Sequence, residues 1–149
     1  MKRSRKLEKT KVILDTSCCL ASILSKASTS AKIIEAMIKG KIFNFYSEEI
    51  LGEVQEVLTR EKFNLEKEKQ DHFLHVLQEI SFEVQQLDNF KVKQCRDPND
   101  DKFLSLANQI DADFIITLDN DLLVLKTIGK TRIVTPVEFL KINDRIINL

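Results

Sequence analysis

The stretch Phe114–Leu123, FIITLDNDLL, carries the clearest structural signal in the chain. Its first five residues are apolar or β-branched, which is typical of a strand buried in a sheet. Asp119 follows at once, and Asn120, Asp121 and two leucines continue into a predicted short helix. Because a carboxylate directly after a buried strand is poorly solvated, we interpret Asp119 as a candidate site residue.

The segment Val12–Thr16, VILDT, repeats this pattern near the N-terminus. Three apolar residues predict a buried strand, and Asp15 ends it. In an open α/β sheet, ligands bind beyond the carboxyl ends of the strands. We therefore expect Asp15 and Asp119 to lie at the same functional edge.

The rest of the chain alternates between strand and helix patterns. Strands are predicted at residues 11–15, 43–46, 81–85, 114–118 and 132–134. Helices are predicted at residues 17–39 with a break near 28–30, 48–60, 66–79, from 100, from 120 and from 136. This order favours a three-layer α/β/α sandwich with a central, mainly parallel sheet of about five strands.

Length and composition set the class of protein. The 149 residues suit one domain, and 43% hydrophobic with 31% charged residues predict a soluble globular chain. We divide it into a basic N-terminal tail at residues 1–11, interpreted as solvated, and a single domain at 12–149. The three cysteines lack metal-binding spacing, and no apolar run suits a secretory leader or membrane span. The expected location is cytoplasmic, without membrane association.

The charge is balanced overall but unevenly distributed. Lys plus Arg and Asp plus Glu each number 23, so no global basic field indicates nucleic acid. Residues 97–121, however, hold seven aspartates against a single lysine. An acidic run is most often a solvated surface, so the position of each acid must decide its role.

Helical periodicity selects two further acids. Glu53 lies at the edge of the apolar arc of its predicted helix, about 40° from Val57. Asp100 falls within the apolar arc of the next acid-bearing helix, whereas Asp101 falls about 60° outside it. Singly, such acids are most simply helix caps or residues flanking the core. Together at one sheet edge they would repel one another, and a hard divalent cation would resolve that conflict.

The donor set predicts both the cation and the chemistry. Carboxylate ligands without a His or Cys cluster indicate Mg²⁺ or Mn²⁺, and such a site suits hydrolysis of phosphodiesters by activated water. Thr16 and Ser17 are candidates to orient Asp15 or bound water. Asp121 is interpreted chiefly as a helix cap, with a supporting role as the alternative. His72 and His75 are interpreted as ordinary histidines of a charged helix.

Five segments together resemble the PIN-domain nucleases, in particular the VapC-like toxins of toxin–antitoxin systems. They are VILDT at 12–16, SEEILGEVQEVL at 47–58, RDPNDDKFLSLA at 96–107, TLDNDLL at 117–123 and IVTPVEFL at 133–140. The resemblance covers the chain after the tail. It implies an endoribonuclease that uses Mg²⁺ or Mn²⁺ to cleave single-stranded RNA. It also implies a second copy and an antitoxin protein as candidate partners.

Carried over residue by residue, the resemblance places catalytic and metal-binding roles on Asp15, Glu53, Asp100 and Asp119. Asp101 is the alternative to Asp100. The family usually has Asn where this chain has Ser17, which puts the orientation of Asp15 or of metal-bound water in question. A non-catalytic PIN-like module that binds RNA or protein is therefore a competing hypothesis. A phospho-accepting receiver domain is disfavoured, because it would want an adjacent acid pair near the first strand.

Overall fold

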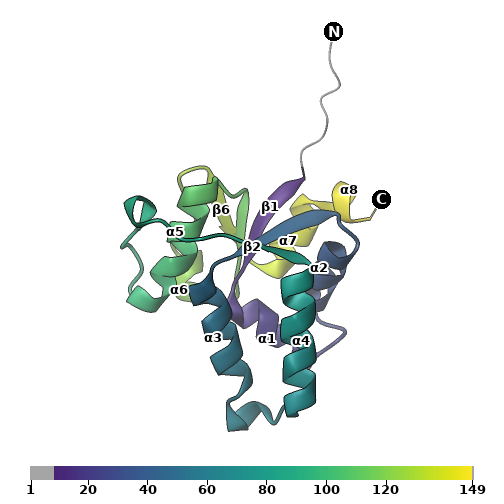
Figure 1. Cartoon of the computed structure of the whole chain (residues 1–149). Helices are drawn as coiled ribbons and strands as arrows, with labels where there is room; N and C mark the ends of the chain where they lie inside the picture. Colours follow the sequence, from purple (N-terminus) through teal and green to yellow (C-terminus); the bar gives the residue numbers. More distant parts are fainter. Residues whose placement is uncertain (1–8, 149) are drawn as a thin grey trace.

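The computed structural model describes residues 9–148 and shows a six-stranded sheet between helices (Figure 1). The strands are β1 (Thr10–Leu14), β2 (Ile42–Tyr46), β3 (Ser81–Glu83), β4 (Phe114–Ile116), β5 (Thr127–Ile128) and β6 (Thr131–Val134). The helices are α1 (Thr16–Leu24), α2 (Thr29–Ile38), α3 (Glu48–Leu58), α4 (Lys67–Glu79), α5 (Asp101–Ile110), α6 (Asn120–Leu123), α7 (Pro136–Ile142) and α8 (Asp144–Ile147). Short 3₁₀ turns occur at Glu61–Phe63, Asp88–Phe90 and Pro98–Asp100.

The sheet order is β3-β2-β1-β4-β6-β5, and every pairing except β5 with β6 is parallel. β1 and β4 are therefore neighbours at the centre, and Leu14 pairs with Ile116 at their carboxyl ends. The backbone N–H of Asp15 continues this pairing by donating to the carbonyl of Ile116 at 3.1 Å. The predicted neighbourhood of the two strand ends is confirmed.

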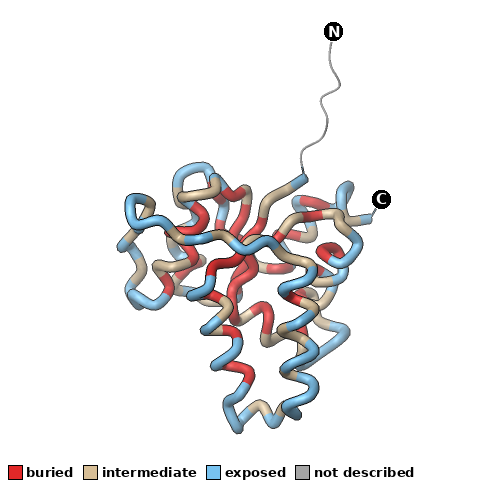
Figure 2. Tube along the Cα trace, viewed as in Figure 1, coloured by how far each residue is buried: buried red, intermediate tan, exposed pale blue. Residues whose placement is uncertain are grey.

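Alternate residues of the central strands pack into two separate cores. Val12 and Leu14 face one core with α1, α2, α4 and α7, whereas Ile13 faces the other with α5 and α6. This alternation follows from the two-residue period of a strand. The predicted three-layer α/β/α sandwich is confirmed: α5 and α6 cover one face and α2 and α7 the other (Figure 1). Figure 2 shows the buried residues concentrated along the central strands.

The number of strands and several element boundaries differ from the sequence prediction. The sheet has six strands rather than about five, because the two-residue β5 forms a hairpin with β6 around Gly129, whose φ is +58°. So short a strand has no apolar alternation to reveal it. β1 begins at Thr10, so the end of the predicted tail belongs to the sheet. Residues 1–8 of that tail lie outside the described residues.

The structure also places the histidines and cysteines that the sequence singled out. His72 and His75 are both exposed on α4. Cys18 and Cys19 are buried free thiols, while Cys95 is only partly buried. None of the helices in the described part of the chain combines the length and apolar character that a membrane span requires.

Candidate active site

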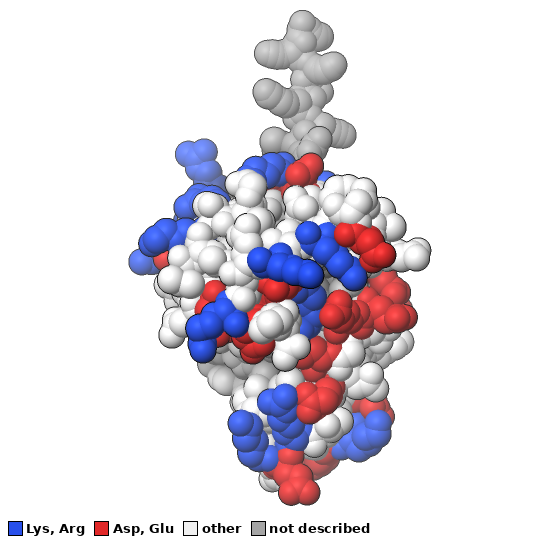
Figure 3. All heavy atoms as spheres, turned by 90° about the vertical axis from the view of Figure 1, so that its left-hand side faces the viewer, with Lys and Arg blue, Asp and Glu red and all other residues white. Residues whose placement is uncertain are grey.

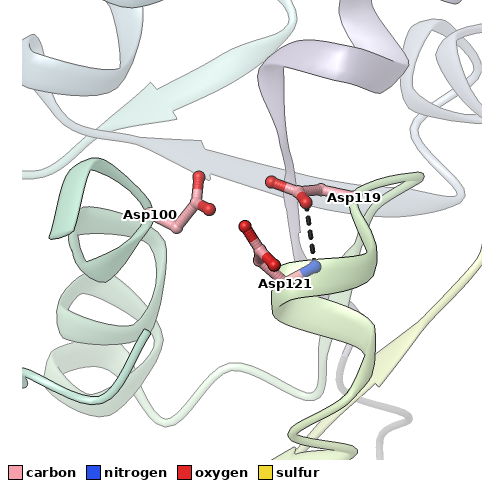
Figure 4. A group of neighbouring side chains, drawn as sticks. All are labelled: Asp100, Asp119 and Asp121. Atoms are coloured by element: carbon pink, nitrogen blue, oxygen red, sulfur yellow. Dashed lines mark hydrogen bonds between the residues drawn. The ribbon is translucent and has the colours of Figure 1, made fainter. Parts of the chain in front are cut away.

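Three aspartates converge beyond the carboxyl ends of β1 and β4. Asp100, Asp119 and Asp121 each offer a carboxylate oxygen, and these oxygens lie within 4.8 Å of one another. Figure 4 shows the three side chains pointing toward a common space, Asp100 from the start of α5 and the other two from the start of α6. Two of the four predicted acids are thus gathered, with Asp121 as the third member.

The start of α6 places two of these carboxylates. Asp119 is in extended backbone and is the N-cap, since its Oδ1 accepts a hydrogen bond from the backbone N–H of Asp121 at 2.9 Å. Asp121 therefore lies in the first helical turn, where a carboxylate is favoured by the helix dipole. The interpretation of Asp121 as the helix cap was wrong, because Asp119, two residues earlier, is the N-cap of α6.

Asp100 is the least solvated member of this group. It ends the 3₁₀ turn Pro98–Asp100 and is 9% exposed, and its side chain makes no capping hydrogen bond. Burial, together with the adjacent carboxyl of Asp119 and the charges of Asp97 and Glu53, raises the pKa of Asp100 to about 7. A bound cation would stabilise the charged form of a carboxylate that is buried among other acids in this way.

Asp15 is buried at the end of β1 and is held by three donors. Its Oδ1 accepts from Ser17 Oγ at 2.6 Å and from the backbone N–H of Cys18 at 3.1 Å, so it also caps α1. Its Oδ2 accepts a hydrogen bond from Thr117 Oγ1. Burial raises the pKa of Asp15, and the hydrogen bonds from Ser17, Thr117 and Cys18 oppose that shift. The carboxylate is therefore fixed in orientation before any ligand binds.

Thr117 joins Asp15 to Asp119. The same hydroxyl that donates to Asp15 accepts a hydrogen bond from the backbone N–H of Asp119 at 2.9 Å. Thr117 is fully buried and lies just beyond β4, which ends at Ile116 rather than at Leu118 as predicted. Sequence reasoning missed it because a threonine inside a strand-like run gives no sign that its hydroxyl will contact two distant acids.

Ser17 also bridges the two strand ends. Besides donating to Asp15, Ser17 Oγ accepts a hydrogen bond from the backbone N–H of Leu118 at 3.2 Å. The neighbouring Thr16 is buried, and its hydroxyl has no hydrogen-bond partner among the described residues. The structure thus gives Ser17 a positioning contact with Asp15 and gives Thr16 none.

Glu53 stands on α3 and is held by a lysine. Glu53 Oε1 lies 2.5 Å from Lys102 Nζ, and the Lys102 side chain is only 9% exposed. Burial and the charges of both Asp15 and Glu53 raise the pKa of the Cys19 thiol, so both acids lie near that residue. Glu53 and Asp15 lie outside the three-aspartate group, although the charge of Glu53 acts on Asp100 and Thr117 links Asp15 to Asp119.

Asp101, the alternative to Asp100, makes contacts away from the three-aspartate group. Its Oδ1 accepts hydrogen bonds from the backbone N–H groups of Gln94 and Cys95 at 2.9 and 2.8 Å. Although its partial burial acts to raise the pKa, these hydrogen bonds lower the pKa of Asp101 overall. Asp101 anchors the segment before α5, and the structure favours Asp100 at the site.

Arg96 is a second residue that the sequence gave no reason to select. Its Nε and Nη2 donate to the two carboxylate oxygens of Asp121 at 3.1 and 3.0 Å, across 25 positions of sequence. The Arg96 side chain is 83% exposed, so this bidentate ion pair is open to solvent on the arginine side. Asp121 therefore has a cationic partner in the metal-free chain, as Glu53 does.

The donor set fits a hard divalent cation. Mg²⁺ binds oxygen ligands at about 2.1 Å, so two oxygens on opposite sides of the ion are about 4.2 Å apart. The oxygens of Asp100, Asp119 and Asp121 already lie within 4.8 Å of one another. Neighbouring ligands in an octahedral shell are about 3.0 Å apart, so side-chain rotations that draw the three oxygens together would let them share one ion, with water completing the shell.

Comparisons with known proteins agree with this architecture. The fold is similar to VapBC2 from Rickettsia felis, solved bound to a DNA fragment from its promoter, with a TM-score of 0.58, 16% identity, and coverage of 83% of this chain and 97% of that one. It is equally similar to Mycobacterium tuberculosis VapC20, described as a sarcin-ricin loop cleaving toxin, with a TM-score of 0.58, 11% identity, and coverage of 81% and 98%.

Sequence comparison extends the likeness and identifies the family. The uncharacterized protein MJ1680 of Methanocaldococcus jannaschii is 28% identical, with 94% of this chain and 96% of the relative covered. The sequence model of the PIN domain family matches residues 11–121, which include all the acids described above. The chain belongs to the PIN domain family.

Proposed function

We propose that this protein is a divalent-metal-dependent endoribonuclease that hydrolyses phosphodiester bonds of single-stranded RNA. The observation that carries the proposal is the oxygen-only group of Asp100, Asp119 and Asp121 at the carboxyl ends of β1 and β4, in a chain of the PIN family. Ligands bind at this edge of open α/β sheets. A metal bound there would activate water and offset the charge of the scissile phosphate.

The residues divide into ligands and residues that position them. Asp100 and Asp119 are assigned as metal ligands with Asp15 and Glu53, and Asp121 is added because of its place in the cluster. Thr117 and Ser17 hold Asp15 in one orientation. Asp101 supports the fold of the adjoining segment instead of the ligand set.

Biological context follows from the relatives. The likeness in fold to the VapC chain of VapBC2 and to VapC20 supports a toxin of a toxin–antitoxin pair. An antitoxin protein is then the expected partner, and a homodimer the expected assembly. Co-expression with the product of the adjacent open reading frame tests this: a stable complex in which RNA cleavage is suppressed is expected. A neighbour that neither binds nor inhibits would contradict the toxin assignment.

The nuclease proposal is tested with a 5′-labelled single-stranded RNA, purified protein and Mn²⁺. Wild-type protein is expected to cleave, while EDTA or Asp119→Asn should stop cleavage by removing the cation or its ligand. Asp71→Asn on α4 is the matched control, because its exposed ion pair with Lys67 contributes little to stability. Equal cleavage by wild type and Asp119→Asn would indicate a contaminating nuclease and contradict the proposal.

A non-catalytic binding module is the second candidate. Two of the acids, Glu53 and Asp121, are already held by Lys102 and Arg96, so their charges are partly offset without metal. On this alternative, the protein would bind RNA in EDTA and in Mn²⁺ alike and leave it intact. Mn²⁺-dependent cleavage that Asp119→Asn abolishes would exclude it.

A further inference from the structure

The connection between β3 and α5 carries a row of cations that leads to the acidic group. In the segment 91–96, KVKQCR, Lys91 and Lys93 are exposed, whereas Val92 and Cys95 pack against the core beside α5. Lys91 and Lys93 lie on either side of Val92 in the sequence, and both stay exposed while Val92 packs inward. The row ends at Arg96, whose guanidinium already contacts Asp121.

This segment is fixed in place without regular secondary structure. The backbone N–H of Val92 donates to Ser105 Oγ at 2.9 Å, and those of Gln94 and Cys95 donate to Asp101 Oδ1. Three hydrogen bonds to α5 thus hold the backbone, and the two lysines are presented from a fixed segment. Cations displayed on a fixed backbone lose less entropy on binding a ligand than cations on a mobile loop.

A hollow of about 520 Å³ lies between this segment and α5. Its charged lining comprises Lys91, Lys93 and Lys102 with Glu49 and Asp101. Asp101 accepts hydrogen bonds from two backbone N–H groups, and the nearby charge of Lys93 also lowers its pKa, while Lys102 pairs with Glu53. The lining of the hollow therefore holds three lysines against the two carboxylates of Glu49 and Asp101. Lys91 pairs with Asp88 at 3.3 Å, but both side chains are largely exposed, so that pair is weak and exchangeable.

We propose that the segment 91–96 binds the backbone of the single-stranded RNA substrate through Lys91, Lys93 and Arg96, and leads it to the acidic group. The inference rests on the proposed function and assigns a path to its substrate. Figure 3, which looks onto this side of the molecule, shows Lys and Arg side chains over the upper and middle part of the face and a band of Asp and Glu beside them. The Cα atoms of Lys91 and Lys93, two residues apart, are at most about 7 Å from each other, which suits successive phosphates of an extended RNA strand.

The test measures binding of a fluorescein-labelled oligouridine RNA by anisotropy in EDTA, where metal-dependent cleavage cannot occur. Lys91→Ala/Lys93→Ala is compared with Lys67→Ala/Lys69→Ala, an exposed pair on α4 with the same spacing and the same change in charge. In each pair the first lysine has one surface carboxylate partner. The 91/93 variant should bind several-fold more weakly, with a salt slope reduced by about 1.4, since each phosphate contact contributes about 0.7.

Each outcome decides the proposal. The proposal is overturned if the 91/93 variant has the same affinity and salt slope as the 67/69 control. It is also overturned if the wild-type chain does not bind RNA. Tighter binding of polyglutamate than of RNA, lost in the same variant, would assign the surface to an acidic protein and would also overturn it. If RNA binding depends on Lys91 and Lys93 but no cleavage occurs in Mn²⁺, the binding path stands and the nuclease proposal fails. If wild type cleaves RNA and the 91/93 variant shows an unchanged KM, the nuclease stands and the path fails.

Discussion

Thr117 Oγ1 donates a hydrogen bond to Oδ2 of Asp15, which lies 102 residues earlier in the sequence. The same oxygen accepts a hydrogen bond from the backbone N–H of Asp119. One hydroxyl thus links the acids that end the two central strands, and it does so in a fully buried position. The orientation of Asp15 relative to α6 depends on this residue.

Replacing that hydroxyl tests its positioning role. Thr117→Val keeps the shape but leaves a buried carboxylate oxygen without its donor, which should lower the free energy of unfolding by about 1–3 kcal/mol. Mn²⁺ affinity should fall about 10–100-fold, as expected for residues that orient ligands. Urea unfolding and Mn²⁺ titration measure the two effects. Thr117→Ser, which keeps the hydroxyl, should recover most of the Mn²⁺ affinity; failure of this recovery would contradict the positioning role.

The pKa of Asp100 predicts a pH dependence of the metal-free protein. In the folded chain this pKa is raised to about 7 by burial and by the neighbouring acids Asp119, Asp97 and Glu53. Between the unfolded pKa of about 3.9 and this value, the folded state binds more protons than the unfolded state. Stability from this group is therefore present at low pH and is lost as the pH rises through about 7.

Urea unfolding of wild type and Asp100→Asn in EDTA measures this contribution. The difference in unfolding free energy between the two proteins should shift in favour of the variant from about pH 5 to about pH 8, because the variant carries no charge to bury. Using the difference cancels the titration of groups that do not interact with Asp100. A difference that stays constant over this range would contradict the pKa assigned to Asp100.

The Lys102–Glu53 ion pair predicts an altered response to metal. Lys102→Met keeps the length of the largely buried side chain but leaves Glu53 without its cation, close to Asp100. The metal-free protein should lose about 1–3 kcal/mol, less than for a fully buried pair because Glu53 is partly exposed. Mn²⁺ should then raise the melting temperature more in Lys102→Met than in wild type. An equal or smaller rise in melting temperature would show that Glu53 does not interact with the bound metal.

Much of this fold could be predicted from the sequence, because burial of one face of a helix or strand places apolar residues at regular intervals along the chain. The apolar runs at β1 and β4 and the Asp directly after each run located the centre of the sheet and its functional edge. Serine is a common residue at helix starts, and Ser28 and Ser47 accept backbone hydrogen bonds at the starts of α2 and α3. These signals depend on neighbouring residues only, so a sequence displays them.

The parts that were missed depend on contacts between distant residues. The fork from Arg96 to Asp121 and the Thr117 bridge join segments whose approach only the folded backbone defines. The role of Asp121 was misjudged because both Asp119 and Asp121 are good capping residue types. Only the extended backbone of Asp119, with φ of −88° and ψ of 119°, decides between them. The hairpin of β5 is too short to leave a periodic pattern.

Thermal unfolding with and without Mn²⁺ tests the central claim, that the carboxylates at the ends of β1 and β4 bind a divalent cation. A ligand that binds only the folded state stabilises it by mass action, so wild type should gain about 5–10 °C at ~100-fold excess over Kd. Asp119→Asn and Asp15→Asn should each lose that rise, while Asp71→Asn on α4 should keep it. An equal rise in wild type and in the two site variants, or no rise in wild type, would contradict the account.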